Sequence, residues 1–159
     1  MFRRHPFLTA ATLLYLGLVG WITLGPQPLD SGQVAWLNRA IAVLARHPAT
    51  DWLTYSRVEF LANIAMFVPV GVFLVLLMGR KLWAPAVVVG IALTFTIEFI
   101  QLFLPTRVPD VRDLIANSTG AAVGVIVAMI VTTPAALRDR RHARELAAAR
   151  ASARTLVSR

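Results

Sequence analysis

The strongest constraint on this chain is a series of four long apolar segments separated by short polar stretches. They cover about residues 7–25, 58–79, 82–104 and 114–133. An α-helix rises about 1.5 Å per residue, so roughly 20 apolar residues are needed to cross a hydrocarbon core about 30 Å thick. Each segment approaches or exceeds this length. The pattern predicts an all-α protein, a polytopic transmembrane helical bundle with four spans.

The amino-acid composition supports a membrane protein and excludes several chemistries. Hydrophobic residues make up 57% of the chain and charged residues 15%, which is too apolar for an ordinary soluble domain. Cysteine is absent, which excludes disulfides, thiolate metal sites and a cysteine nucleophile. The net charge of +8 would suit nucleic acid, but the basic residues gather at the chain ends and in one short turn. We expect no nucleic-acid partner, no cofactor and no metal.

The distribution of basic residues predicts how the chain is oriented. If the N-terminus is cytoplasmic, eleven Lys and Arg residues flank the inner side of the membrane and five flank the outer side. The positive-inside rule then favours cytoplasmic N- and C-termini. The first apolar segment follows Arg3 and Arg4, as the core of a signal peptide would. It is longer than a usual signal-peptide core and has no clear cleavage site, which favours an uncleaved span.

The loop between the first and second spans has the pattern of an amphipathic helix. Apolar residues recur at helical spacing after Asp30 and Ser31, either of which can cap a helix. These residues are Val34, Leu37, Ile41 and Leu44. Trp36 and Trp52 would suit the headgroup region. The pattern predicts an outer-loop helix, lying either on the membrane surface or over the ends of the spans.

The last 26 residues form a segment of different composition, rich in Ala and Arg, which we expect to break from the last span at Pro134. It is either a helix that contacts anionic lipid or a solvated tail whose charge fixes the topology. We therefore divide the chain into a four-helix transmembrane domain, residues 1–133, and a basic cytoplasmic tail, residues 134–159.

Polar residues gather at one predicted depth of the bundle. The outer part of the second span carries Glu59 and Asn63, the third carries Glu98 and Gln101, and the fourth begins with Asp110, Asp113 and Asn117. A charged group in the membrane interior costs at least about 2.5–3.5 kcal/mol, so such residues usually face the bundle interior or a wet cavity. Three helices that share this depth predict a polar pocket opening outward.

The charged residues before the fourth span suggest how the pocket binds a ligand. The predicted ligand-binding residues are Asn63, Glu98, Gln101, Arg107, Asp110, Asp113 and Asn117. Arginine presents a flat charged fork suited to phosphate or carboxylate. Arg107 lies between Pro105 and Pro109, in a rigid turn that would present it to an anion. The alternative, for both Arg107 and Arg112, is a salt bridge to a nearby carboxylate. Asp113 is expected to accept hydrogen bonds from first-turn N–H groups.

Small residues and a proline indicate where helices pack closely. Gly120 and Gly124 are spaced so that another helix can approach, and packing alone explains them well. Pro69, just before Gly71, removes a backbone hydrogen bond and is expected to kink the second span. The kink either widens the outer half of the bundle or only adjusts packing. We assign these four residues to helix packing.

Three sequence blocks together resemble the signature of VanZ-like membrane proteins. They are NIAMFVPVG at residues 63–71, EFIQ at 98–101 and RVPDVRDLIANSTG at 107–120. The similarity covers about residues 58–130, and the first span and its loop only in general layout. The resemblance implies a small bacterial plasma-membrane protein of the cell envelope, linked to resistance to the glycopeptide antibiotic teicoplanin.

Three functions remain open at this stage. The first is a binding protein whose pocket holds the head of a lipid-linked or anionic envelope molecule, lowering susceptibility to glycopeptides. Its partners would be membrane lipids, and a lipid-linked cell-wall intermediate or the antibiotic itself. The second is an intramembrane enzyme with Glu98 as general acid or base. The third is a structural or assembly partner. Binding is favoured over catalysis because neither a Gly-rich phosphate loop nor a nucleophile elbow occurs.

Overall fold

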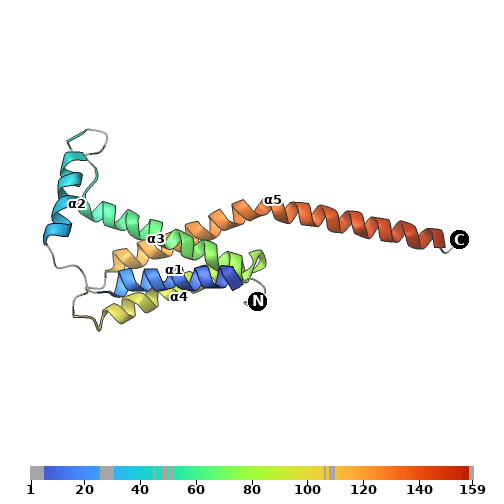
Figure 1. Ribbon diagram of the computed structural model, residues 1–159, viewed down its shortest axis with the longest axis horizontal. Coiled ribbons are helices and arrows are strands. Elements are labelled where there is room, and N and C mark those ends of the chain that lie inside the picture. Colours follow the sequence, from blue (N-terminus) through green and yellow to red (C-terminus); the bar gives the residue numbers. More distant parts are fainter. Residues whose placement is uncertain are drawn as a thin grey trace.

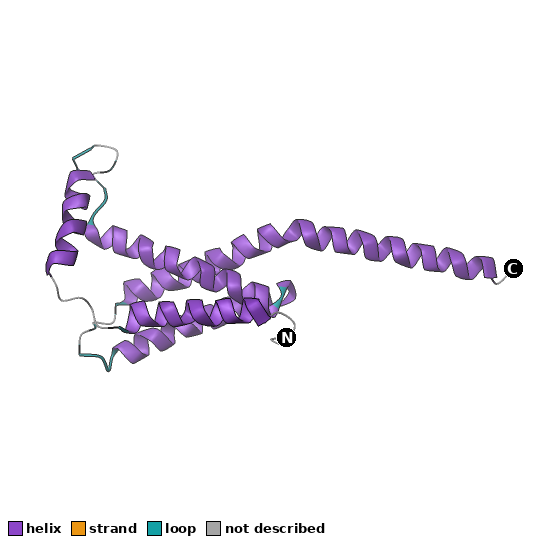
Figure 2. Cartoon of the chain, viewed as in Figure 1, coloured by secondary structure: helices purple, strands orange, loops and turns teal. Residues whose placement is uncertain are grey.

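The computed structural model describes residues 6–25, 31–44, 46–47, 50, 52–105, 107 and 110–157. Across these residues the regular structure is helical, without strands (Figures 1 and 2). The elements are α1 (Pro6–Leu24), α2 (Ser31–Leu44), α3 (Tyr55–Met78), the 3₁₀ turn η2 (Arg80–Leu82), α4 (Trp83–Gln101) and α5 (Val111–Val157).

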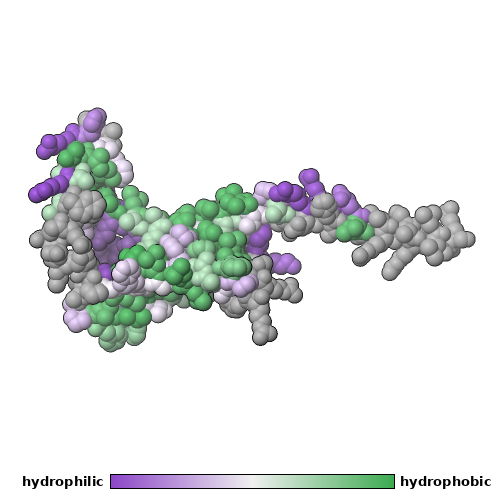
Figure 3. Space-filling model, viewed as in Figure 1, coloured by the Kyte–Doolittle hydropathy of each residue, from purple (hydrophilic) through white to green (hydrophobic). Residues whose placement is uncertain are grey.

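Four helical segments have the length and apolar character needed to cross a membrane. They are Pro6–Leu24, Tyr55–Met78, Arg80–Gln101 and Val111–Ala135. This confirms the predicted all-α bundle with four candidate spans. The third span, which includes α4, ends at Gln101 rather than Leu104. Its end lies just before Pro105, and a proline disfavours the helical conformation of the residue that precedes it. Figure 3 shows a largely hydrophobic surface along the bundle, with hydrophilic residues toward its ends.

The loop helix predicted from the apolar spacing is present as α2. It lies at one end of the bundle, near the start of α3 (Figure 1). Asp30, a proposed cap, and the side chain of Trp36 lie outside the described residues. The side chain of Trp52 is 47% exposed. We refer to this end of the bundle as the α2 end.

The expected break at Pro134 is wrong, because α5 continues through it as one helix of 47 residues. The part of α5 that follows Ala135 leaves the bundle at the end opposite α2, where the N-terminus of α1 also lies (Figure 1). A proline in a helix removes one hydrogen bond but need not end the helix, and the Ala-rich sequence that follows has high helix propensity. Pro69 likewise lies inside an uninterrupted α3.

The helices α3 and α5 pack most extensively on each other, at a crossing built on glycine. A Cβ on Gly71 would collide with the backbone oxygen of Ala121, and one on Gly124 would collide with that of Val68. A Cβ on Gly120 would meet the backbone oxygen of Ile64. The two backbones are therefore in direct contact, which is the close approach expected for Gly120 and Gly124.

The other two spans pack around this central pair. One core cluster joins α1 and α4 to α3 through Val19, Phe67, Val70 and Ile97. A second joins α4 and α5 to α3 nearer the opposite end, through Val75, Ala86, Val125 and Ala128. The helix α1 is the most loosely packed span. Of its most apolar 18-residue stretch 17% is buried, compared with 39% for the corresponding stretch of α5. Its attachment must therefore depend on a few specific contacts.

Candidate functional site

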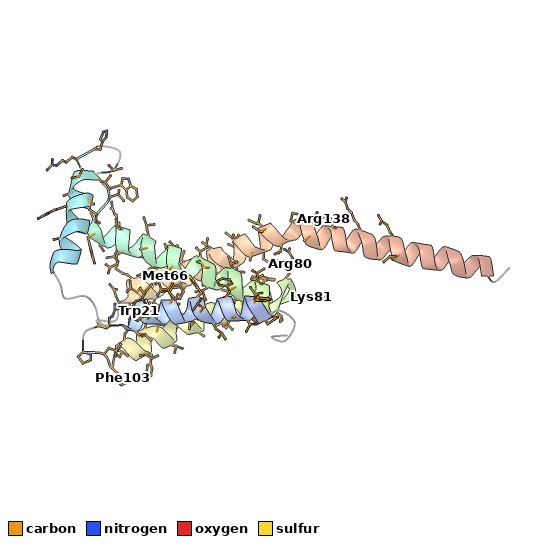
Figure 4. The ribbon with its side chains drawn as sticks, in the orientation of Figure 1. Trp21, Met66, Arg80, Lys81, Phe103 and Arg138 are labelled. Carbon is orange, nitrogen blue, oxygen red and sulfur yellow. The ribbon has the colours of Figure 1, made fainter. Side chains whose placement is uncertain are left out.

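Polar side chains from all four spans surround one cavity at the α2 end of the bundle. Its volume is about 90 Å³, and it is lined by Ile22, Thr23, Glu59, Asn63, Met66, Ile97, Glu98, Gln101, Arg107, Asp113 and Asn117. Six of the seven residues predicted to bind a ligand are in this lining; Asp110 lies beside it. Figure 4 shows Trp21, Met66 and Phe103 toward this end, with Arg80 and Lys81 toward the other.

The cavity forms at this end because four helix termini meet there with compatible polar residues. The carboxyl ends of α1 and α4 and the amino ends of α3 and α5 all contribute. In α3 and α4 the polar residues are spaced four and three apart, which places each pair on one helical face. The depth inferred from the sequence is therefore shared by α1 as well, which sequence reasoning did not include.

Asp113 projects into the cavity rather than capping its own helix. Its Oδ1 accepts a hydrogen bond from Asn63 Nδ2 at 2.7 Å, which joins α5 to α3. Asp110 supplies the cap instead, because its Oδ1 accepts from the backbone N–H of Arg112 at 2.8 Å. The expectation that Asp113 is the cap is therefore wrong: α5 begins at Val111, three residues earlier than the apolar pattern suggested.

Two buried oxygen atoms of the cavity lining have no hydrogen-bond partner among the described residues. They are Oε1 of Glu98 and Oδ1 of Asn117. Asn117 is 2% exposed, and the other carboxylate oxygen of Glu98 accepts from the backbone N–H of Asp110 at 3.2 Å. An unpaired buried acceptor costs about 1–3 kcal/mol, and such groups are rare in folded proteins. These two atoms therefore mark where a hydrogen-bond donor would bind.

Gln101 and Arg107 hold the carboxyl end of α1. Gln101 Nε2 donates to the carbonyl oxygen of Thr23 at 2.8 Å. Arg107 donates from Nε and Nη2 to the carbonyl oxygen of Gly25 at 3.0 and 2.7 Å, and from Nη2 to that of Ile22 at 2.8 Å. The last carbonyls of a helix have no intrahelical donor, and Ile22 would need the N–H of residue 26, which is a proline.

These hydrogen bonds show that part of the Arg107 guanidinium is already engaged within the protein. The sequence predicts that the rigid turn presents the guanidinium to an incoming anion, and binding of an anion by Arg107 stays a prediction. Two of its nitrogens donate to the carbonyl oxygens of Ile22, in α1, and of Gly25, directly after it, where a cation also complements the negative end of the helix dipole. These two nitrogens contact backbone carbonyl oxygens rather than the carboxylates that the sequence offered as the alternative.

Arg112 lies next to the central cavity rather than in its lining. It donates to both the hydroxyl and the backbone oxygen of Ser56, and its guanidinium lies 6.0 Å from the centre of the Phe60 ring. The small recess around it also includes Glu59, Asp110 and Asp113. Arg112 therefore fastens the start of α5 to the start of α3.

An apolar groove lies directly beside the polar cavity. It has a volume of about 280 Å³ and is lined by Phe95, Glu98, Phe99, Leu102, Asp110, Val111 and Leu114. Several of these apolar side chains are exposed on the outer face of α4 and α5, which faces lipid in a membrane-spanning bundle. Glu98 lines both spaces. A hydrocarbon chain lying in the groove would therefore have one end next to the polar cavity.

Sequence reasoning missed Ile22, Thr23, Met66 and Ile97 in the cavity wall, and the whole groove. The one available signal was Pro26, which leaves a carbonyl at the end of the first span without its usual donor. Apolar residues such as Met66 carry no signal that separates a cavity wall from a core. Among the described residues, no group of three or more acidic or histidine side chains is arranged to hold a metal ion.

The fold and the site define a polytopic α-helical membrane protein with a polar cavity between its spans. The model of the VanZ/LLP1 family matches residues 12–132, and the chain belongs to this family. The match begins within α1, so it includes the first span and the loop as well as the three sequence blocks. No curated protein and no solved structure matches the chain.

Proposed function

We propose that this chain is a binding protein of the bacterial plasma membrane that recognises a lipid-linked molecule of the cell envelope. The polar head occupies the cavity at the α2 end, and the hydrocarbon chain lies in the groove between α4 and α5. With cytoplasmic termini, as the basic residues favour, the cavity opens toward the outer leaflet. Sequestering or presenting such a molecule would lower susceptibility to a glycopeptide such as teicoplanin.

The observation that carries this proposal is the position of Glu98 between the two spaces. A ligand for the cavity alone would be small and water-soluble, and a ligand for the groove alone would be an ordinary acyl chain. One residue that lines both spaces matches an amphiphile, which has a polar head joined to an apolar chain. The two unpaired oxygens supply a reason for a polar head to enter.

The proposal is tested by filling the groove and measuring the lipid that copurifies with the protein. Leu114→Trp places a bulky side chain in the groove, and Ile115→Trp places the same side chain on the neighbouring position of α5, outside the groove lining. Native mass spectrometry should show less bound lipid for Leu114→Trp and an unchanged amount for Ile115→Trp. Equal lipid retention by both variants would refute binding in the groove.

The link to antibiotic susceptibility requires a separate measurement in cells. A susceptible bacterial host expressing the chain should tolerate a higher teicoplanin concentration than the same host carrying an empty vector. The Leu114→Trp variant should lose this difference at equal protein abundance, whereas Ile115→Trp should keep it. If expression of the chain leaves the inhibitory concentration unchanged, the resistance part of the proposal is wrong, and lipid binding is judged by mass spectrometry alone.

A second candidate is an intramembrane acid/base enzyme, favoured by the unpaired carboxylate oxygen of Glu98. Glu98→Gln keeps the size of the side chain and an acceptor for the N–H of Asp110, but it removes the group that exchanges a proton. Conversion of an envelope lipid extract by the wild-type chain, lost in Glu98→Gln while lipid is still bound, would favour the enzyme. An unchanged lipid profile with the wild-type chain would favour binding.

A further inference from the structure

We propose that the head group recognised by the cavity carries a primary ammonium, rather than a phosphate or a carboxylate. This inference rests on the proposed function, because it names the chemistry of the head of the lipid-linked ligand. It replaces the anion expected from the sequence, which depended on a guanidinium presented to the ligand.

The charges around the cavity favour a cation. The lining contains three carboxylates, from Glu59, Glu98 and Asp113, and one guanidinium, from Arg107. The guanidinium is directed to the carbonyl oxygens of Ile22 and Gly25. The adjoining recess adds one group of each sign, Asp110 and Arg112, so carboxylates outnumber guanidiniums by four to two. An ammonium would offset this excess of negative charge, whereas a phosphate would add to it.

The unpaired atoms require donors, and an ammonium has only donors. Glu98 Oε1 and Asn117 Oδ1 both accept hydrogen bonds, and neither has a partner among the described residues. A primary ammonium offers three N–H groups, as the ammonium of a lysine does. It therefore has enough donors for both oxygens, which line the same cavity. A quaternary ammonium has no N–H, and the oxygens of a carboxylate or a fully ionised phosphate are further acceptors, so these heads leave both atoms unsatisfied.

The size of the cavity agrees with a small head group. Roughly 10–15 Å³ of such volume holds one water molecule, so about 90 Å³ has room for an aminomethyl or aminoethyl group together with several water molecules. The chain bearing the ammonium would leave past Glu98, which also lines the apolar groove. The same ammonium on a free, water-soluble amine would satisfy the oxygens but leave the groove unused.

The inference is tested with probes that share one chain and differ in the head. The protein is placed in nanodiscs of phosphatidylcholine, which has no primary ammonium, and its affinities for dodecylammonium, dodecanol and dodecyl phosphate are measured from shifts in the unfolding temperature. Ethylammonium is the soluble comparison. The variants are Glu98→Gln, Asn117→Leu and the control Glu145→Gln, which removes a carboxylate from an exposed position of α5 beyond the spans.

We expect the wild-type chain to prefer dodecylammonium over the other two amphiphiles by about tenfold or more, because hydrogen bonds to charged groups are about twice as strong as neutral ones. Each cavity variant should reduce this preference, and Glu145→Gln should keep it. Asn117→Leu serves as an independent test if Glu98→Gln does not fold. A preference that survives both cavity variants would overturn the assignment.

The four probes distinguish failure of this inference from failure of the proposed function. Equal or tighter binding of dodecyl phosphate overturns the ammonium but leaves amphiphile binding intact. Equal binding of all three amphiphiles also overturns it, since water then suffices for the two oxygens. Ethylammonium that binds as tightly as dodecylammonium supports the ammonium and overturns the lipid-linked ligand. Binding of none of the probes to a folded protein overturns both.

Discussion

Replacing Arg107 with glutamine should weaken the attachment of the end of α1 to the bundle. The arginine makes three hydrogen bonds to two carbonyls at the carboxyl end of α1, at 2.7–3.0 Å. Glutamine can retain one of these bonds and brings no charge. Hydrogen bonds between membrane helices average about 0.6 kcal/mol and those to charged groups in soluble proteins about 1.5–3 kcal/mol. Adding the lost interaction with the helix dipole, we expect local destabilisation of about 2–4 kcal/mol.

The assay uses the absence of native cysteine. A single cysteine introduced as Val19→Cys lies in the core cluster that α1 shares with α3 and α4, at a position that is 1% exposed. A membrane-permeant thiol reagent reaches it only when α1 opens, so the labelling rate reports the local opening free energy. A loss of 2 kcal/mol corresponds to labelling about 30 times faster. The Arg107→Lys variant should label at an intermediate rate, because it keeps the charge but not the fork.

The control is Arg39→Gln, which removes an arginine from an exposed position of α2. Its labelling rate should equal that of the parent chain. If Arg107→Gln also labels at the parent rate, the hydrogen bonds to α1 carry no stability, and the arginine would again be available to bind an anion. This outcome would also weaken the argument for an ammonium.

Three further substitutions test other contacts by equilibrium unfolding in one detergent and lipid mixture. Gly71→Ala should destabilise the bundle by about 1–3 kcal/mol because its Cβ would collide with the backbone of α5. The control Gly17→Ala, with open space around it, should change stability by less than about 0.5 kcal/mol. Similar losses of stability in both variants would refute the glycine crossing. Asp113→Ala should cost about 1–3 kcal/mol by leaving the Asn63 amide unpaired, and Asp113→Asn, which keeps an acceptor, should cost less; the reverse order would be inconsistent with the contact. Asp110→Ala should cost about 1 kcal/mol through loss of the α5 cap, and unchanged stability would argue against that role.

The sequence was sufficient to predict the number of spans, the loop helix and the depth of the polar residues. These features depend on local patterns, because a span requires a run of apolar residues and a polar residue in a span must avoid lipid. Asn63, Glu98, Gln101 and Asn117 were predicted to share one depth, and all four line the cavity. Their proposed ligand contacts stay predictions.

Only the tertiary structure decided what each polar group contacts. Whether Arg107 meets an anion or the end of α1 depends on how the last carbonyls of one helix lie against a turn 82 residues later. The boundary of α5 similarly decided that Asp110 caps the helix and that Asp113 meets Asn63. Hydropathy fixes the depth of a residue, but hydrogen bonds are short and directional, so their partners follow from the packing of helices distant in sequence.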